Sequence, residues 1–353
     1  MSSKKTNNDK DKSTDSKGTK SASTSSKGAK SGSTGSKGAK SGSTGSKVAK
    51  SGSTDNKGSK PAPADKKGLK YKIRTGAISL ACIVAAIAIF LVQQQTQLQA
   101  PIPDGEIFVH FIDVGQGDSI LIQSADHAVL IDAGTTASTQ SIINHLEYVG
   151  IDTIDVVVAT HPHADHIGGM PGVIDRFDVR EVWMPDRYHT TATFERFLDA
   201  IERNGLSYTP ISAGDRLSAG AIQMTAVAPN SSGHSSLNDY SISLHMQFGQ
   251  TSFLFTGDME SVSEREVLEA GWNIQSNVLE VSHHGSRTST TEAFLDAVNP
   301  EIAVISVGAG NQFGHPHTEV LERLNARNVQ VLRTDELGTI ILVTNGETIY
   351  RYN

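Results

Sequence analysis

The sequence is poor in thiols, with one cysteine, Cys82, in 353 residues. Cys82 lies in an uncharged apolar segment, so the rest of the chain has neither a disulfide nor a thiolate ligand. The part that follows, roughly 250 residues, is long enough to bury a core that needs no disulfide. Any metal ion in this part must therefore be held by His and Asp side chains, with Asn as a further candidate.

Lysine is absent after Lys72, and the charge of the chain is divided accordingly. Up to residue 74 there are 19 Lys and Arg against 5 Asp and Glu, a net charge of +14, whereas the remainder has 12 basic and 33 acidic residues, a net charge of −21. The basic segment is either a ligand for anionic lipid or nucleic acid, or a solvated spacer. The acidic remainder disfavours long nucleic acid, because proteins that bind it present a basic face.

Large apolar side chains are scarce in residues 1–74. A ten-residue unit recurs there as SKGTKSASTS, SKGAKSGSTG, SKGAKSGSTG and SKVAKSGSTD. Such a composition cannot bury enough apolar surface to offset chain entropy, so it predicts a disordered tail.

Residues 75–93 form the one long apolar run, with the uncharged sequence GAISLACIVAAIAIFLV at 76–92. This length is at the short end for a helix that spans a bilayer, which needs about 20 residues. Basic residues precede the run up to Arg74, and the next one is Arg176, so the tail is predicted to be cytoplasmic and the remainder extracellular. Residues 75–93 are thus predicted to form a single transmembrane helix, and a cleaved signal peptide is the alternative. Residues 94–104 are predicted to form a linker.

Beyond residue 105, hydrophobic patterning predicts alternating strands and helices. Strands are expected at 107–112, 119–122, 128–131, 154–159, 222–227, 241–248, 252–255, 278–281 and 302–307, and helices at 138–150, 264–270, 291–298 and 318–325. Asn345-Gly346 predicts a hairpin between 339–343 and 348–352. Two strand-rich halves interleaved with helices indicate an α/β domain of two packed sheets with helices outside.

Several of these strands end in acidic or histidine side chains. Asp132 follows VLI, the sequence HPHADH occupies 161–166 after VVVAT, Asp258 closes FLFTGD, and His283 follows VLEVS. Neutral imidazole and carboxylate are usual ligands of zinc, manganese and iron. We therefore expect four strand ends to converge on one edge and form a metal site.

The order LIDAG, THPHADHIGG, FTGD and SHHGS resembles the metallo-β-lactamase superfamily. Four longer motifs resemble its ComEC-type branch, which includes the hydrolase domain of bacterial DNA-uptake competence proteins: FIDVGQGDSILI, LNDYSISL, VSHHGSRTS and VGAGNQFGHPH. The resemblance covers residues 105–353 and implies a four-layer αβ/βα sandwich in a bacterial membrane protein. The chain lacks the multi-pass channel of the full competence protein, so a role in DNA transport is not implied.

The resemblance implies a centre with one or two divalent ions, zinc or manganese. It suggests His161 and His163 as ligands of the first ion, Asp165 and His166 as ligands of the second, and Asp258 as the bridge. His283 or His284 would be the late histidine ligand, with His283 favoured because it comes first after the strand. Many members have a third histidine for the first ion, where this sequence has Asn238-Asp239. Asn238 or Asp239 lining the site, or His234 as a ligand, are the alternatives.

Six further residues are assigned to the surroundings of this centre. Asp132 is expected to orient a ligand histidine. Asp118 is either catalytic or a structural buttress after Gly117. Contacts to substrate oxygens are assigned to Ser286, Thr288 and Asn311. His315 is the candidate proton donor to a leaving group, unless GHPH is simply a helix-entry turn.

Three functions are compatible with this assignment. The first is a phosphodiesterase or nuclease in which paired ions generate a metal-bound hydroxide near neutral pH, with Asp165 holding the proton of the water. The second is a hydrolase of a carbonyl substrate, such as a β-lactam or lactone. The third is a non-catalytic surface module, which the complete set of spaced ligands disfavours.

Overall fold

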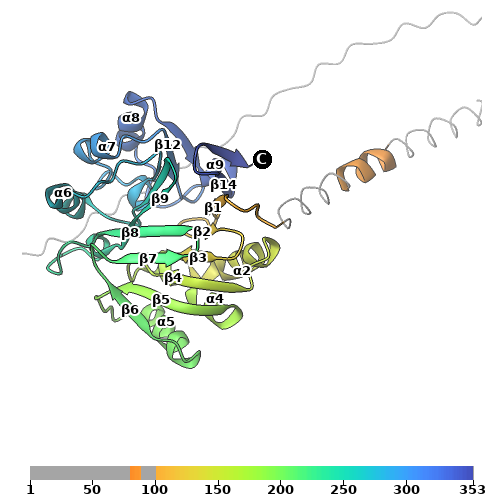
Figure 1. Cartoon of the computed structure of the whole chain (residues 1–353), viewed down its shortest axis with the longest axis horizontal. Helices are drawn as coiled ribbons and strands as arrows, with labels where there is room; N and C mark the ends of the chain where they lie inside the picture. Colours follow the sequence, from red (N-terminus) through yellow and green to blue (C-terminus); the bar gives the residue numbers. More distant parts are fainter. Residues whose placement is uncertain (1–79, 89–100, 353) are drawn as a thin grey trace, which may run out of the picture. The chain divides into compact units, whose positions relative to one another are not determined.

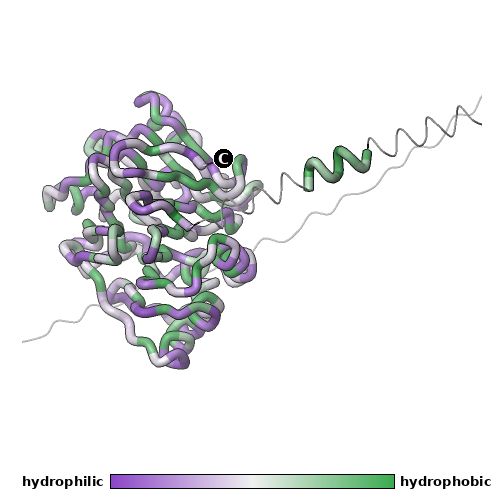
Figure 2. Tube along the Cα trace, turned by 45° about the vertical axis from the view of Figure 1, so that its right-hand side comes forward, coloured by the Kyte–Doolittle hydropathy of each residue, from purple (hydrophilic) through white to green (hydrophobic). Residues whose placement is uncertain are grey.

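A computed structural model describes residues 80–88 and 101–352. The predicted tail (1–74) and the greater part of the predicted membrane segment (75–93) and linker (94–104) lie outside these residues. Residues 80–88 are helical and largely hydrophobic (Figure 2). Their exposed apolar side chains include Leu80 and Ile83. In the ranges that the structure describes, no helix combines the length and the apolar character needed to cross a bilayer.

Residues 101–352 form two sheets of mixed direction. The first has eight strands in the order β15 (Ile349–Tyr352), β14 (Ile340–Thr344), β1 (Ile107–Phe111), β2 (Ile120–Gln123), β3 (Ala128–Ile131), β4 (Thr153–Val158), β5 (Asp178–Pro185) and β6 (Tyr208–Ile211). The second has seven, in the order β13 (Gln330–Arg333), β12 (Ile302–Ile305), β11 (Val278–Glu280), β10 (Thr251–Phe255), β9 (Ser243–Phe248), β8 (Ile222–Ala228) and β7 (Arg216–Ala219).

Each sheet contains one run of parallel strands. β3, β4, β5 and β6 are parallel in the first sheet, and β10, β11, β12 and β13 are parallel in the second. The carboxyl ends of neighbouring parallel strands lie at the same edge of a sheet. The loops that follow β3, β4, β10 and β11, which contain the polar motifs, are therefore brought to common edges.

Helices cover the outer face of each sheet (Figure 1). The helices after the first-sheet strands are α2 (Thr139–Tyr148), α3 (Ala164–Ile167), α4 (Met170–Arg176) and α5 (Ala192–Arg203), and those of the second half are α6 (Ser261–Ala270), α7 (Glu292–Val298), α8 (Thr318–Ala326) and α9 (Thr334–Leu337). One apolar core lies between the sheets and contains Phe111, Phe253 and Leu342. Two further cores lie under the two sets of helices. The prediction of a mixed α/β fold of two sheets with helices outside is confirmed.

Most predicted elements of the domain are present within a few residues of the expected bounds. The Asn345-Gly346 hairpin is confirmed by the antiparallel pairing of β14 with β15. The elements that the sequence did not predict lie mainly between residues 164 and 219, where α3, α4, β5, α5, β6 and β7 occur, together with β13 and α9. These elements extend both sheets at their edges and add helices to the outer layers.

Truncation of Phe253 tests the core between the sheets. Its side chain is fully buried there and stacks on Phe255, with 6.2 Å between ring centroids. Phe253→Ala is expected to lower the free energy of unfolding by about 3–5 kcal/mol, because it leaves a cavity in a close-packed layer. Leu337→Ala, at a position 39% exposed, is the control and should change it by less than about 0.5 kcal/mol. Equal urea midpoints for the two variants would contradict this assignment of the core.

Candidate metal centre

Asp258 lies where the two halves of the domain meet. It follows β10 in the turn Thr256-Gly257-Asp258 and is buried. Its Oδ1 lies 3.3 Å from Nε2 of His166 and 3.4 Å from Nε2 of His284, whereas its Oδ2 lies 3.6 Å from Nε2 of His161. The two oxygens of one carboxylate therefore face two different groups of histidines.

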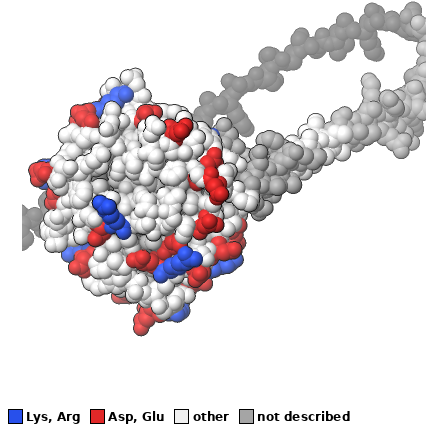
Figure 3. All heavy atoms as spheres, viewed as in Figure 1, with Lys and Arg blue, Asp and Glu red and all other residues white. Residues whose placement is uncertain are grey.

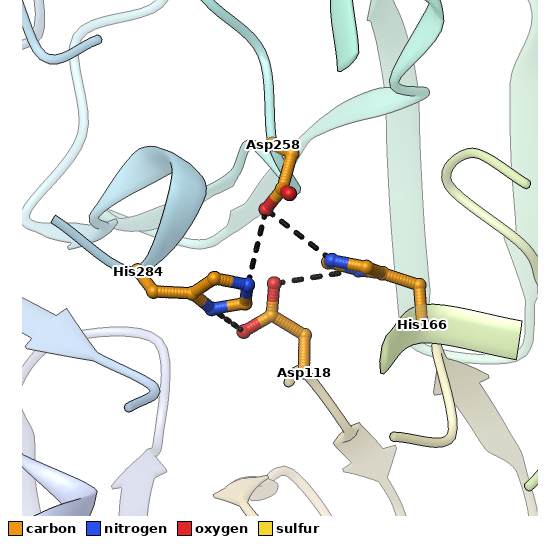
Figure 4. A group of neighbouring side chains, drawn as sticks. All are labelled: Asp118, His166, Asp258 and His284. Carbon is orange, nitrogen blue, oxygen red and sulfur yellow. Dashed lines mark ion pairs between the residues drawn. The ribbon is translucent and has the colours of Figure 1, made fainter. Parts of the chain in front are cut away.

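The first group consists of Asp118, His166, Asp258 and His284, all buried (Figure 4). One potential ligand atom from each lies within 4.8 Å of the others. Asp118 approaches both histidines, with its Oδ2 3.6 Å from Nδ1 of His166 and its Oδ1 3.4 Å from Nδ1 of His284. The group combines two imidazoles with two carboxylates, which is a donor set suited to a divalent transition metal.

Three atoms of this group make no hydrogen bond to any described residue although they are buried: Nε2 of His166, Nε2 of His284 and Oδ1 of Asp258. An unpaired buried polar atom is costly, and such atoms are rare in folded proteins. Here the three point towards one another, and each can donate an electron pair to a cation. The residues present therefore fit a metal ion.

The second group consists of His161, His163 and Asp258. Nε2 of His161 lies 2.9 Å from Nδ1 of His163, and the two rings are nearly perpendicular. His161 is fully buried, and its Nδ1 lies 3.1 Å from the hydroxyl of Thr160. Because that nitrogen has a polar neighbour, Nε2 is left to face Asp258.

Two hydrogen bonds orient the histidines of the first group. Nδ1 of His166 donates to Oδ2 of Asp132 at 2.7 Å, and Nδ1 of His284 donates to the carbonyl of Ser306 at 2.9 Å. Asp132 is itself held by the backbone amide and hydroxyl of Thr160, at 2.9 and 2.6 Å. Polar partners of this kind fix the tautomer and the ring plane of a ligand histidine.

Two glycines permit the close backbone contacts of the site. Gly117 has φ +136°, and a Cβ there would overlap the carbonyl oxygen of Asp165, which accepts the backbone N–H of Asp118. Gly169 follows the histidine motif, and a Cβ there would overlap the carbonyl oxygen of Ala133. Because glycine has no side chain, the loops of β1–β2, β3 and β4 can lie against one another.

Burial and charge shift the pKa of the central groups in opposite directions. Burial alone would lower the pKa of His166, but the carboxylates of Asp258 and Asp132 outweigh it and raise that pKa well above its usual value. Burial would raise the pKa of Asp258, but the imidazoles of His166 and His284 lower it well below its usual value. Burial also lowers the pKa of His161, as does the nearby His166. Asp258 is therefore an anion and His161 a neutral donor, which are the states that metal ligands require. The carboxylates that raise the pKa of His166 supply negative charge that a bound cation would neutralise in place of the proton.

The two adjacent histidines of the late motif face different surroundings. His284 belongs to the first group, whereas His283 is 22% exposed and lies outside both groups. Nε2 of His283 is 3.7 Å from Oδ2 of Asp258, and its Nδ1 is 3.4 Å from Oε1 of Glu260 and 3.4 Å from the amide nitrogen of Asn238. The sequence favoured His283 over His284, and the structure places His284 in the buried group.

Asn238 reaches the centre through this contact with His283. Asp239 instead accepts the backbone N–H groups of Glu260 and Ser263 at the start of α6. His234 packs on Tyr240 at 5.0 Å between ring centroids and faces Glu266, so it is outside both groups.

Two further aspartates lie beside the histidines of the first group. Asp165, expected as a ligand, lies at the rim with its Oδ2 3.6 Å from Nε2 of His284 and belongs to neither group. Asp118, expected as a buttress or a catalytic group, is one of the four clustered residues. Burial would raise the pKa of Asp165, but the neighbouring imidazoles of His284 and His166 lower it, so this carboxylate is ionised.

The other residues assigned to substrate contacts are partly engaged within the protein. The hydroxyl of Ser286 is 3.0 Å from that of Thr288, which lies 3.4 Å from Nδ1 of His283. The side chain of Asn311 bonds to the backbone of its own loop. The ring of His315 lies 5.5 Å from that of His283, and burial together with the neighbouring imidazoles lowers its pKa to about 4.

Glu280 is a supporting residue that the sequence did not predict. It is buried at the end of β11, and its Oε2 accepts the backbone N–H of Thr256 at 2.7 Å and of Gly257 at 3.3 Å. Burial and the carboxylate of Asp118 raise the pKa of Glu280 well above its usual value. The signal in the sequence was an acidic residue inside the apolar run VLEV. Glu280 thus holds the turn that presents Asp258.

Substitution of Glu280 tests this role. Glu280→Leu would leave the amides of Thr256 and Gly257 unpaired in the interior and is expected to lower the free energy of unfolding by about 1–3 kcal/mol. Glu280→Gln, which keeps an accepting oxygen, is the matched variant and should lower the free energy of unfolding by less. Urea denaturation of both variants checks this, and a Leu variant as stable as the Gln variant would exclude the role.

Comparison with known proteins gives the family. The model of the "Metallo-beta-lactamase superfamily" matches residues 112–309. The chain is 35% identical over 251 residues to ComE operon protein 3 of Bacillus subtilis, which covers 66% of this chain and 32% of that protein. It is 30% identical over 243 residues to competence protein ComA of Neisseria gonorrhoeae, which covers 68% of this chain and 32% of that protein. The chain thus spans about a third of the length of these relatives.

Among solved structures, the metallo-β-lactamase fold protein YhfI of Bacillus subtilis is similar, with a TM-score of 0.46 and 12% identity over 70% of this chain and 100% of that one. The family match covers the loops that carry Asp118, Asp132, the histidine motif, Asp258 and His284. This chain belongs to the metallo-β-lactamase superfamily, as a metal-dependent hydrolase related to the bacterial ComEC-type competence proteins.

Proposed function

We propose that the protein is a membrane-anchored, extracytoplasmic phosphodiesterase or nuclease with a two-metal centre. The observation that carries the proposal is the division of the Asp258 carboxylate between two groups of potential ligands, with buried ligand atoms that have no other partner among the described residues. A carboxylate shared in this way is suited to bridge two cations.

The proposed ligands of one ion are Asp118, His166, His284 and Asp258, and those of the other are His161, His163 and Asp258, with His283 at its open side. Zinc or manganese suits this set of imidazoles and carboxylates. Bound ions of this kind lower the pKa of water and polarise a phosphoryl oxygen, which suits in-line displacement at phosphorus.

The surrounding residues would orient these ligands and handle protons. Asp132 and the Ser306 carbonyl hold the rings of His166 and His284 so that each presents Nε2. The ionised, partly exposed carboxylate of Asp165 would hold the proton of the attacking water. His315 would protonate the leaving oxygen. It is neutral in the free protein, and a phosphodiester anion beside it would raise its pKa.

The relatives and the surface charge together indicate the kind of phosphodiester. The name of one relative, competence protein ComA, refers to competence, and the motifs of this sequence resemble those of DNA-uptake competence proteins. This resemblance favours phosphorus over carbonyl substrates such as β-lactams. The face drawn in Figure 3 has acidic and basic side chains interspersed. With a net charge of −21 after residue 74, a short or locally bound phosphodiester suits the domain better than long duplex DNA.

The anchor is proposed from the apolar run around residues 80–88. Those residues are helical, and the side chains of Leu80, Ile83, Val84 and Ile87 are 54–64% exposed. Exposed apolar side chains around a helix are favourable in lipid and costly in water.

Removal of the shared carboxylate tests the metal centre. The wild-type full-length protein should bind about two divalent ions per chain and hydrolyse bis(p-nitrophenyl) phosphate. Asp258→Ala should lose both ions and reduce this hydrolysis more than about 100-fold, since even residues that only support metal ligands contribute about 10–100-fold. Asp199→Ala removes an exposed aspartate on α5 and is the matched control. It should retain both the bound ions and the hydrolysis. Metal content by mass spectrometry and initial rates provide the measurement.

Two outcomes would contradict the proposal. Turnover of nitrocefin without turnover of the phosphodiester would assign the centre to carbonyl substrates. Full activity of metal-free protein, or of Asp258→Ala, would exclude the two-metal mechanism.

Protease accessibility tests the topology. Protease added to intact cells should digest the domain at 101–352, because the basic residues before the apolar run keep the tail inside. Permeabilised cells are the control for digestion of the tail. A domain protected in intact cells would reverse the orientation, and a domain released into the medium would indicate cleavage instead of anchoring.

A further inference from the structure

The side chain of Asn311 holds the loop that follows β12, which lies beside the metal centre. The amide nitrogen of Asn311 donates to the carbonyls of Gly308 at 3.0 Å and His315 at 2.6 Å. Its Oδ1 accepts the backbone N–H of Phe313 at 3.1 Å and of His315 at 3.0 Å. Four hydrogen bonds within residues 308–315 fix the conformation of this loop.

The fixed loop presents an aromatic ring to solvent. Phe313 is 52% exposed, and in the described part of the chain no other phenylalanine is classed as exposed. Its ring stacks on His315, with 5.6 Å between centroids and 26° between planes. An exposed aromatic ring contributes little to stability, so a loop that orders it in this position points to a role in binding.

The position of the ring connects it with the centre. His315, against which Phe313 stacks, lies 5.5 Å from His283 and 6.3 Å from His284, between ring centroids. The ring of His315 also contacts that of His317, with 4.8 Å between centroids. The ring of His315 alone therefore lies between Phe313 and the histidines His283 and His284.

Arg287 lies next to His317. The backbone N–H of Arg287 donates to Nδ1 of His317 at 3.1 Å. The guanidinium of Arg287 is 58% exposed and pairs with the carboxylate of Glu319 at 3.3 Å. A surface ion pair of this kind contributes little, so the guanidinium can exchange its carboxylate for a phosphate at small cost. An aromatic face and an available arginine are the two elements that proteins use to bind single-stranded nucleic acid.

We propose that the exposed face of Phe313, backed by His315, is a stacking subsite for an unpaired nucleobase of single-stranded nucleic acid, with Arg287 contacting a neighbouring phosphate. This inference rests on the proposed phosphodiesterase activity and names its substrate class. Stacking on an aromatic ring does not depend on base identity, so the subsite accepts any sequence. It excludes duplex, in which the faces of the bases are already stacked.

The test compares two single-stranded substrates of equal length. One is an oligothymidylate, and the other has the same phosphates but abasic tetrahydrofuran sugars throughout. The readout is the ratio of kcat/KM for the first to kcat/KM for the second, measured on the full-length metal-loaded protein. Phe313→Ala should lower this ratio about 5- to 150-fold, the factor that corresponds to the stacking of one base. Phe313→Trp should preserve it.

Tyr350→Ala, which removes another exposed aromatic ring (44%) on the edge strand β15, is the matched control and should leave the ratio unchanged. A ratio that is the same in wild type and Phe313→Ala would overturn the subsite while leaving the phosphodiesterase intact. If the wild type hydrolyses neither substrate, the proposed function fails, and fluorescence anisotropy with the same oligonucleotides tests the subsite by itself. Equal affinities of wild type and Phe313→Ala for oligothymidylate would then overturn it.

Discussion

The structure depends on one buried carboxylate that faces two groups of histidines. Asp258 has an oxygen directed at His166 and His284 and another directed at His161. A charge in this position would oppose folding if it remained unpaired, and the imidazoles around it stabilise it. The ligand atoms without hydrogen-bond partners among the described residues fit a cation, which would complete this compensation. The same arrangement of side chains therefore stabilises the buried charge of Asp258 and forms the metal site.

The fold keeps this arrangement rigid by support from both halves. Asp132 in the first half orients His166, and Glu280 in the second holds the backbone amides ahead of Asp258. Gly169 lets the helix after the histidine motif lie against the loop of Asp132. Because parallel strands end at a common edge, residues distant in sequence reach the same place with little freedom to move. Supporting groups of this kind determine ligand geometry as strongly as the ligands do.

The sequence predicted the two-sheet architecture and the strand ends well, because apolar runs and the polar residues after them are local patterns. It could not decide between His283 and His284, since both have positive φ (52° and 54°), and the usual alternation of side chains along a strand fails there. Asp118 looked like a turn residue because its place in the group depends on long-range packing of Gly117 against Asp165. Helix α5, by contrast, carried an available signal in the capping Thr191 and the spacing of Phe194, Phe197 and Ile201.

The charges and the exposed aromatic ring around the centre bear on the kind of substrate. An acidic domain with isolated arginines would suit local contacts with a phosphodiester, and the exposed Phe313 would supply a contact that depends on neither charge nor sequence. The proposed function depends on the shared carboxylate of Asp258. The direct test is a crystal structure of the metal-loaded protein with anomalous scattering. Two ions are expected, each bound to a different oxygen of Asp258, one with His161 and His163 and the other with Asp118, His166 and His284. A single ion that does not contact Asp258, or no ion between these residues, would contradict it.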